Sequence, residues 1–279
     1  MDAVYEAIVQ ARRRGEGAVL VTVVDVQGTT AARLGAKMLV SVNGERVGTI
    51  AGGALERAAG AKARDLVTMR QSQLVRYATT ADDRALEGEA VGEPCVAHVA
   101  LFFDFIGHSH HAFLFGGGHV GKAIARQLGL LPYFVTVVDC WPEYPDAVEG
   151  ANRVVIAEYE AALQDEPVPL GSYFFVATSS HELDYVALRR IMASGWEPAY
   201  VGMVGSARKA ETLAARLRND LSDAAPWDAL YSPVGLDIGG PTPEEIAVAV
   251  AAEMQAVRYG KAGHRHMRLG THPGVTLSE

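Results

Sequence analysis

The chain has 279 residues, of which 49% are apolar and 21% charged, so it can bury a large core and is not intrinsically disordered. Its formal net charge of −8 argues against general attraction to nucleic acid or to an anionic membrane surface, and no run approaches the roughly 20 apolar residues that a membrane-spanning helix needs. The first residues place acids before bases, unlike a secretory signal, and Cys95 and Cys140 are too few for a disulfide framework, so we expect a cytoplasmic protein.

The first part of the chain predicts a small α/β module with an antiparallel component. Asn43-Gly44 between two apolar runs is typical of a hairpin turn. Periodicity and β-branched runs predict the elements in this order: a helix over 1–15, strands over 18–26, 38–42 and 46–50, a helix over 54–71, and strands over 73–79 and 95–106.

The polar segment 107–111 carries no pattern, so we place a domain boundary after residue 106. Beyond it strands and helices alternate, which implies a parallel sheet. Strands are expected before the glycines at 116–118 and over 133–139, 153–157, 172–180 and 198–206. Helices are expected after the glycines and over 184–194, 207–219 and 243–260. The expected fold is therefore α/β: a small N-terminal α/β module (1–106), a Rossmann-like parallel-sheet domain (107–260) and a flexible tail (261–279).

The segment Gly116-Gly117-Gly118-His119-Val120-Gly121 has the glycine spacing of a dinucleotide-binding turn, with a strand before it and a helix after it. Gly116 permits the tight turn, Gly118 lets the backbone approach a pyrophosphate, and Gly121 lets the helix pack closely. The N–H groups at the helix start, where His119 lies, face the anion. The segment predicts a nucleotide site.

Asp139 ends the following strand, 18 positions beyond Gly121. A carboxylate at this point accepts hydrogen bonds from the adenosine ribose and repels a 2′-phosphate, which favours NAD over NADP. The alternative is a Rossmann-like domain that binds no nucleotide, because fold does not determine function.

Two further strand ends belong at the same sheet edge. One carries Thr178 and His181, and the other carries Gly202, Gly205 and Ser206, again before a helix that presents N–H groups to an anion. His181 fits three roles, a proton-transfer residue, a metal ligand or a loop residue held by hydrogen bonds, and the sequence leaves all three open. No residues are assigned to a metal site, and the sequence leaves open whether a metal is bound.

In the first module, residues 28–38 and 48–56 place Thr, Arg and Lys side chains close to glycines. These groups are donors for a phosphorylated or oxyanionic ligand, and Gly52-Gly53 directly precedes a helix. The alternative is a tight hairpin that enters a helix and binds nothing.

Four blocks in order resemble the XdhC/CoxI family, the accessory proteins of xanthine dehydrogenase and related molybdenum hydroxylases. They are GTTAARLGAKMLVSVNGERVGTIAGGALE (28–56), FLFGGGHVGKAIA (113–125) with the following VVD, AYVGMVGSARKAETLAARL (199–217) and SPVGLDIGGPTPEEIAVAVAAE (232–253). The resemblance implies a chaperone that binds molybdenum cofactor (molybdopterin), protects it while a cysteine desulfurase supplies sulfur, and helps insert it into the hydroxylase apoenzyme. Carried over from the family, the residues expected to line the first module's site are Gly35, Lys37, Gly52, Gly53 and Glu56.

One departure concerns sulfur. Some relatives carry Cys after the glycine pair, where this chain has Ala54, and alanine can neither ligate molybdenum nor transfer sulfur. Cys140, beside Asp139, is a substitute only if it faces the nucleotide cleft; an ordinary strand-end thiol is the simpler interpretation. Two other hypotheses stay open: an NAD-dependent oxidoreductase with His181 as acid/base, and an NAD(H)-sensing regulatory module. A homodimer is a further open expectation, and no residue pattern identifies its interface.

Overall fold

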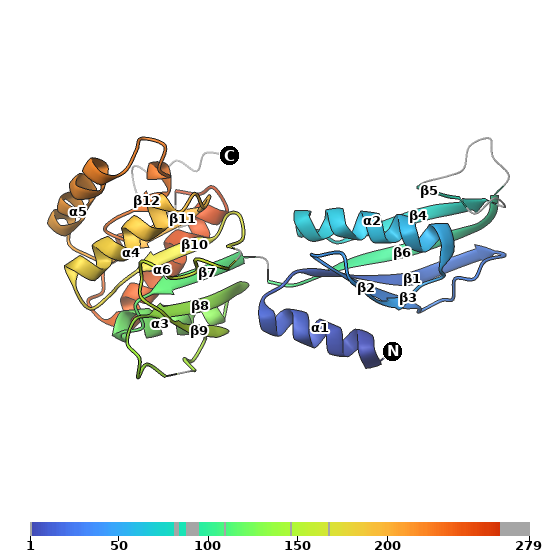
Figure 1. Ribbon diagram of the computed structural model, residues 1–279, viewed down its shortest axis with the longest axis horizontal. Helices are drawn as coiled ribbons and strands as arrows, with labels where there is room; N and C mark the ends of the chain where they lie inside the picture. Colours follow the sequence, from blue (N-terminus) through green and yellow to red (C-terminus); the bar gives the residue numbers. More distant parts are fainter. Residues whose placement is uncertain are drawn as a thin grey trace, which may run out of the picture. The chain divides into compact units, whose positions relative to one another are not determined.

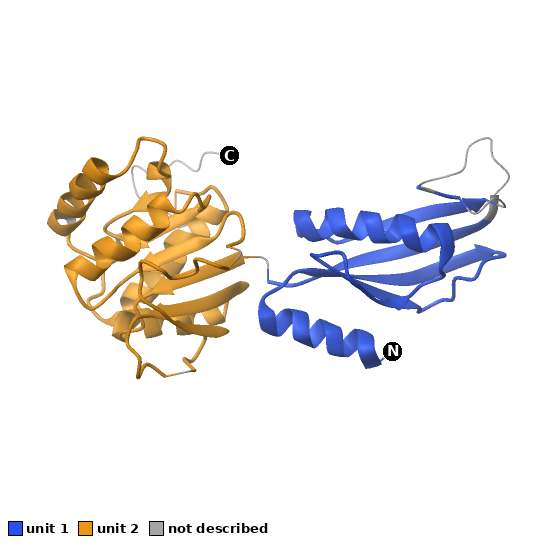
Figure 2. Cartoon of the chain, in the orientation of Figure 1, with its two compact units in different colours: residues 1–109 blue, residues 110–279 orange. Residues whose placement is uncertain are grey.

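A computed structural model of the chain describes residues 2–80, 84–87, 95–108, 110–145, 147–166 and 168–262. Internal contacts divide the chain into two units, residues 1–109 and residues 110–279 (Figure 2). The tail expected to be flexible, 261–279, lies outside the described residues except for its first two positions.

Unit 1 is a six-stranded antiparallel sheet with a helix on each face (Figure 1). Its sheet order is β3-β2-β1-β6-β4-β5. Helix α2 packs Leu55, Ala59 and Leu66 against one face, and α1 packs Val4 and Ala11 near β2 and β3 on the other. The elements are α1 (Asp2–Arg14), β1 (Ala18–Gly28), β2 (Lys37–Ser41), β3 (Arg46–Thr49), α2 (Gly53–Met69), β4 (Gln73–Thr80), β5 (Ala85–Glu87) and β6 (Cys95–Ile106).

Unit 2 is a parallel sheet in the order β12-β11-β10-β7-β8-β9, with α3 and α6 on one face and α4 and α5 on the other. This is the Rossmann order, in which the chain reverses direction across the sheet between β7 and β10. The elements are β7 (His110–Phe115), α3 (His119–Gly129), β8 (Tyr133–Asp139), β9 (Arg153–Ile156), β10 (Tyr173–Val176), α4 (His181–Ala193), β11 (Tyr200–Met203), α5 (Ala207–Asp220), η1 (Trp227–Ala229), β12 (Leu230–Tyr231) and α6 (Pro243–Arg258).

The expected mixed α/β class with a Rossmann-like parallel sheet is confirmed; the differences concern element ends and three short elements that were not predicted, β5, η1 and β12. Strand β10 stops at Val176 rather than at 180, because the chain leaves the sheet to place Ser180 as the N-cap of α4. Helix α4 therefore begins at His181, three residues before the predicted start. Strand β7 begins at His110, inside the segment expected to be irregular, and the rings of His110 and His111 pack against Tyr133 and Phe134 of the next strand.

The core of unit 2 follows from its parallel sheet. Every residue of β10 and β11 is buried, because helices cover both faces. Phe113 and Phe174 stack with ring centroids 5.3 Å apart, and Phe174 stacks in turn on Trp196. This packed core supports the carboxyl ends of β7, β8, β10 and β11.

No helix among the described residues is long and apolar enough to cross a membrane.

Candidate cofactor-binding sites

The glycine turn lies between β7 and α3, at the point where the strand order reverses. Gly116 has φ +105°, and a Cβ there would overlap the carbonyl oxygen of Ala177 at the end of β10. A Cβ at Gly121 would overlap the carbonyl oxygen of Gly116. Gly118, the exposed N-cap of α3, has no atom within 4 Å of its Cβ position. Two of the glycines are therefore needed for packing, and Gly118 leaves space for a ligand to approach.

The middle glycine is held by residues that follow β8. The Gly117 N–H donates to Asp139 Oδ2 at 2.7 Å, and the Tyr144 hydroxyl donates to the Gly117 carbonyl oxygen at 2.7 Å. A Cβ at Gly117 would overlap the Tyr144 ring. Tyr144 was not predicted from the sequence. The feature that could have indicated it is Gly117, because the nucleotide-binding spacing does not require a glycine at this position.

Asp139 makes two backbone contacts. Besides Gly117, its Oδ1 accepts the Trp141 N–H at 2.9 Å. A carboxylate has about four acceptor positions, so these bonds orient Asp139 and leave capacity for a ribose hydroxyl. Burial, followed by the charge of Asp139, raises the pKa of Tyr144 above its ordinary value, so the phenol stays a donor to a higher pH than an exposed tyrosine does. The contact of Asp139 with ribose stays a prediction.

A buried ion pair joins the loops after β10 and β11. Asp184 is 1% exposed, and its Oδ1 accepts the backbone N–H of Thr178 at 2.9 Å and the Thr178 hydroxyl at 2.8 Å. Its Oδ2 meets Lys209 Nζ at 2.5 Å, and the same ammonium donates to the Val204 carbonyl oxygen at 3.1 Å. Ala177, which precedes Thr178, touches the glycine turn after β7. The pair of Asp184 and Lys209 therefore links the loops after β7, β10 and β11 at the carboxyl edge of the sheet.

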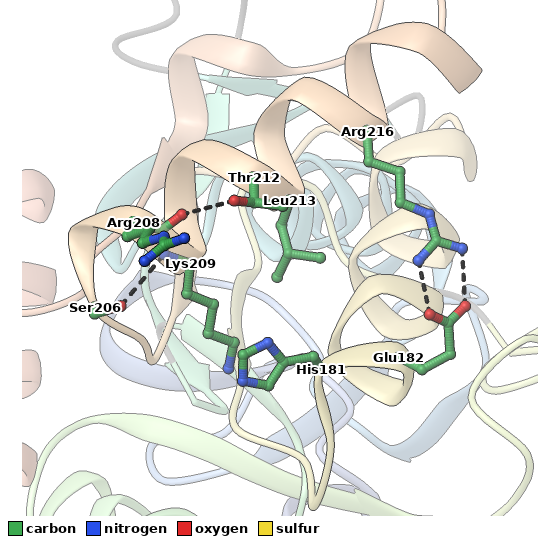
Figure 3. Close-up of a pocket in the computed structure, with 8 residues that line it drawn as sticks. All are labelled: His181, Glu182, Ser206, Arg208, Lys209, Thr212, Leu213 and Arg216. Atoms are coloured by element: carbon green, nitrogen blue, oxygen red, sulfur yellow. Dashed lines mark hydrogen bonds and ion pairs between the residues drawn. The ribbon is translucent and has the colours of Figure 1, made fainter.

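Figure 3 shows a pocket of about 320 Å³ between the first turns of α4 and α5. Ser180 and Ser206 cap the two helices by accepting the N–H groups of Leu183 and Lys209. The residues that line the pocket are His181, Glu182, Ser206, Arg208, Lys209, Thr212, Leu213 and Arg216. Two helix N-termini with basic side chains favour an anionic ligand.

The cations of the pocket differ in their partners. Arg216 makes two bonds of 2.7 and 2.8 Å to Glu182, and Lys209 is paired with Asp184. Within the part of the chain that the structure describes, the Arg208 guanidinium has no acceptor, so it is the cation available to an incoming anion. His181 lines the same pocket as Lys209 (Figure 3). No group of three His, Cys, Asp or Glu side chains suited to a metal ion occurs among these residues.

The remaining predicted residues of unit 2 have different surroundings. His119 is exposed at the first turn of α3, and Gly205 lies against the Lys209 side chain. Gly202 is buried inside β11, where a Cβ would press on Val234 and on the ring of Tyr200. The structure therefore gives Gly202 a packing role in the strand.

In unit 1, a side chain of α2 itself occupies the turn that precedes this helix. Glu56 Oε2 accepts the N–H groups of Ile50 at 3.1 Å, Ala51 at 3.5 Å and Gly52 at 3.0 Å, and also the Thr49 hydroxyl. Burial raises the pKa of Glu56, but these hydrogen bonds outweigh it and hold the pKa below its ordinary value. The glycine pair forms an anion-binding turn, and its occupant here is the Glu56 carboxylate.

The other predicted residues of unit 1 gather at the same end of the sheet. Lys37 pairs with Thr49 across β2 and β3, and its ammonium lies 3.5 Å from the Thr22 hydroxyl. The Gly35 N–H donates to the Val23 carbonyl oxygen at 2.9 Å in the turn that leads into β2. The two segments 28–38 and 48–56 thus meet in space around Thr49.

Positions 54 and 140 bear on whether this chain offers a thiol for sulfur transfer. Ala54 is the second residue of α2, after Gly53, and brings no thiol to the turn. Cys140 follows Asp139 and packs against the core that includes Tyr159, under α4 and α5. The Cys140 thiol is partly buried against this core of unit 2, and its part in sulfur transfer stays a prediction.

Comparison with known proteins gives two family matches. Residues 113–254 match the XdhC Rossmann domain, and residues 11–78 match the XdhC and CoxI family. The two matches fall on the two units.

Three curated relatives are similar to the chain. It is 30% identical over 257 residues to the uncharacterized protein YqeB of Escherichia coli (strain K12), covering 90% of this chain and 45% of that protein. It is 25% identical over 318 residues to a probable xanthine dehydrogenase subunit of Bacillus subtilis (strain 168), covering 87% and 94%. It is 39% identical over 69 residues to the molybdenum cofactor insertion chaperone PaoD of Escherichia coli (strain K12), covering 25% and 22%. The matched regions thus cover less than half the length of YqeB and of PaoD.

Proposed function

Because the chain belongs to the XdhC and CoxI family, we propose that it is an accessory chaperone that binds molybdenum cofactor and delivers it to a molybdenum hydroxylase apoenzyme. The observation that carries the proposal is that both units match this family, with relatives named as a cofactor insertion chaperone and a xanthine dehydrogenase subunit. On this proposal residues 1–106 and 107–260 act as two domains of one carrier in the cytoplasm.

The residues at the carboxyl edge of unit 2 fit the anionic part of this cargo. Molybdopterin carries a phosphate and often a nucleotide, and Gly118 offers open space at a helix N-terminus. Arg208 supplies a cation without an internal acceptor, and Thr178 and Ser206 lie on the two loops that the buried pair holds in place. These groups would bind and orient the phosphate and exclude water from it.

The groups present do not fit direct ligation of molybdenum. Ala54 has no donor atom, and no three-ligand group occurs in the part of the chain that the structure describes. We therefore propose that the protein holds the cofactor through its organic part. A cysteine desulfurase that sulfurates the bound cofactor would then supply the sulfur-carrying thiol itself, with this chain presenting the cofactor.

The test is retention followed by transfer. The full chain is purified from a host that makes molybdenum cofactor, and the released pterin is identified by mass spectrometry. The loaded protein is then mixed with cofactor-free hydroxylase, and we expect activity to rise in proportion to the cofactor delivered. The matched variant Gly118→Ala, whose new Cβ meets no protein atom, should retain much less of the cofactor while its unfolding free energy changes by about 1 kcal/mol or less. Absence of pterin at micromolar cofactor refutes the proposal.

Asp139 favours a second candidate, binding of NAD(H). Its carboxylate lies beside the glycine turn, as in sites that bind an adenosine ribose. The bound nucleotide would act either as a redox signal that changes association with a partner or a second copy of the chain, or as the substrate of an oxidoreductase with His181 in the pocket as acid/base. Titration with NAD and NADH while following oligomeric state tests the first role. Absorbance change at the nicotinamide band with alcohols or aldehydes tests the second.

A further inference from the structure

The segment 139–144, which starts at the last residue of β8, is bound to the glycine turn. Asp139 and Tyr144 hold the N–H and the carbonyl oxygen of Gly117, each at 2.7 Å. The segment is closed on itself, because the Tyr144 N–H donates to the Trp141 carbonyl oxygen at 3.0 Å. Any side chain on this segment therefore has a defined position near the phosphate end of the turn.

Trp141 is the exposed aromatic residue of this segment. Its side chain is 58% exposed, although its N–H donates to Asp139 Oδ1 and its indole N–H to Glu143 Oε2 at 2.5 Å. The other tryptophans have protein partners: Trp196 stacks on Phe174 at 5.2 Å, and Trp227 lies 5.4 Å from the Arg218 guanidinium. Hydrogen bonds therefore fix a large, solvent-exposed apolar ring, which is available to stack on a planar ligand.

We propose that Trp141 is the stacking surface for the base of a nucleotide whose phosphates lie at the glycine turn. The ribose lies between phosphate and base, and Asp139, the predicted ribose acceptor, also accepts the Trp141 N–H at 2.9 Å. Trp141 is therefore next to the carboxylate that would hold the ribose, which is where the proposal places the base. The inference rests on the proposed function for the phosphate position and deepens it by identifying which form of cargo is bound.

The chemical class of ligand is a nucleoside diphosphate unit, either alone or as the nucleotide half of a cofactor. Stacking on an aromatic ring tolerates every base, because each base has a π face. Trp141 therefore adds affinity for a nucleotide form of the cofactor over the form that ends in a single phosphate. Discrimination among bases is not expected from Trp141 itself.

Fluorescence titration of the full chain tests this. The ligands are ADP, GDP and CDP, with inorganic pyrophosphate as the ligand that lacks a base. All three tryptophans lie in unit 2, so the variant Trp227→Phe is the control that removes one without touching the glycine turn. We expect nucleotides to quench the emission of Trp141 in the natural chain. The variants at position 141 lack this reporter, so their nucleotide affinity is measured by calorimetry; we expect Trp141→Ala to weaken binding about 10-fold and Trp141→Phe to weaken it less. Pyrophosphate binding, followed by calorimetry, should be unchanged in both variants.

Equal nucleotide affinity of Trp141→Ala and the natural chain overturns the proposal, and so does a natural chain that binds pyrophosphate but gains nothing from a base. Equal losses for pyrophosphate and ADP also overturn it, because they indicate that the residue supports the turn rather than stacks. Failure of the chaperone proposal has a different signature: no pterin copurifies and no hydroxylase is activated, while the ADP titration still responds to Trp141.

Discussion

The buried pair of Asp184 and Lys209 gives the sharpest stability prediction. Asp184→Asn keeps the size of the side chain and an oxygen for the Thr178 N–H, but it removes the charge that faces Lys209 Nζ at 2.5 Å. The side chains of Lys209 and Asp184 are only 16% and 2% exposed, so the ammonium cannot turn to bulk water without moving. Breaking one partner of a buried pair costs about 3–5 kcal/mol.

The measurement follows unit 2 alone. All three tryptophans belong to it, so tryptophan emission during urea or thermal unfolding reports unit 2 without a contribution from unit 1. For a unit of this size, each kcal/mol lowers the melting temperature by roughly 2–4 °C, so the variant should melt about 10 °C lower.

The control is the exposed pair of Glu182 and Arg216 on the same two helices, with side-chain exposures of 65% and 46%. Glu182→Gln should cost at most about 1 kcal/mol because water screens an exposed pair. The double variant Asp184→Asn with Lys209→Met should recover part of the loss, since it leaves no unpaired charge. If Asp184→Asn costs no more than Glu182→Gln, the reasoning about burial is refuted.

Three further outcomes follow from the turns. Gly116→Ala should destabilise unit 2 by several kcal/mol because of its positive φ and the Ala177 carbonyl, whereas Gly118→Ala should change its unfolding free energy by about 1 kcal/mol or less; equal melting temperatures would contradict this. Tyr144→Phe leaves the Gly117 carbonyl oxygen without its donor and should cost about 1–2 kcal/mol by urea unfolding, against no change for an exposed tyrosine such as Tyr5. The lowered pKa of Glu56 adds stability that is fully present at pH values above the ordinary pKa of a glutamate and is lost as the pH falls through the lowered pKa. Glu56→Gln should remove this pH dependence, which is measured by hydrogen exchange of the α2 amides. If the pH dependence is unchanged in the variant, the carboxylate is not the occupant of the turn.

Much of the fold could be predicted from local pattern. The apolar runs before and after the glycines indicated parallel strands, and the helix expected at Pro243 is present, with Thr242 and Glu245 as the capping box at its start. Strand and helix ends were less accurate. The apolar run over 172–180 continues past the sheet, and only the position of Ser180 as a cap determines where the strand stops.

The candidate sites divide in the same way. The sequence by itself determined the glycine turn at Gly116–Gly121, because the glycine spacing and the flanking strand and helix are local signals. Only the tertiary structure decided which groups hold that turn and which anion positions are already filled. Tyr144 reaches Gly117, Lys209 reaches Asp184, and Glu56 closes the turn before its own helix. Most of these partners are distant in the chain, and their contacts depend on how helices and loops pack on the sheet, which local residue preferences do not specify.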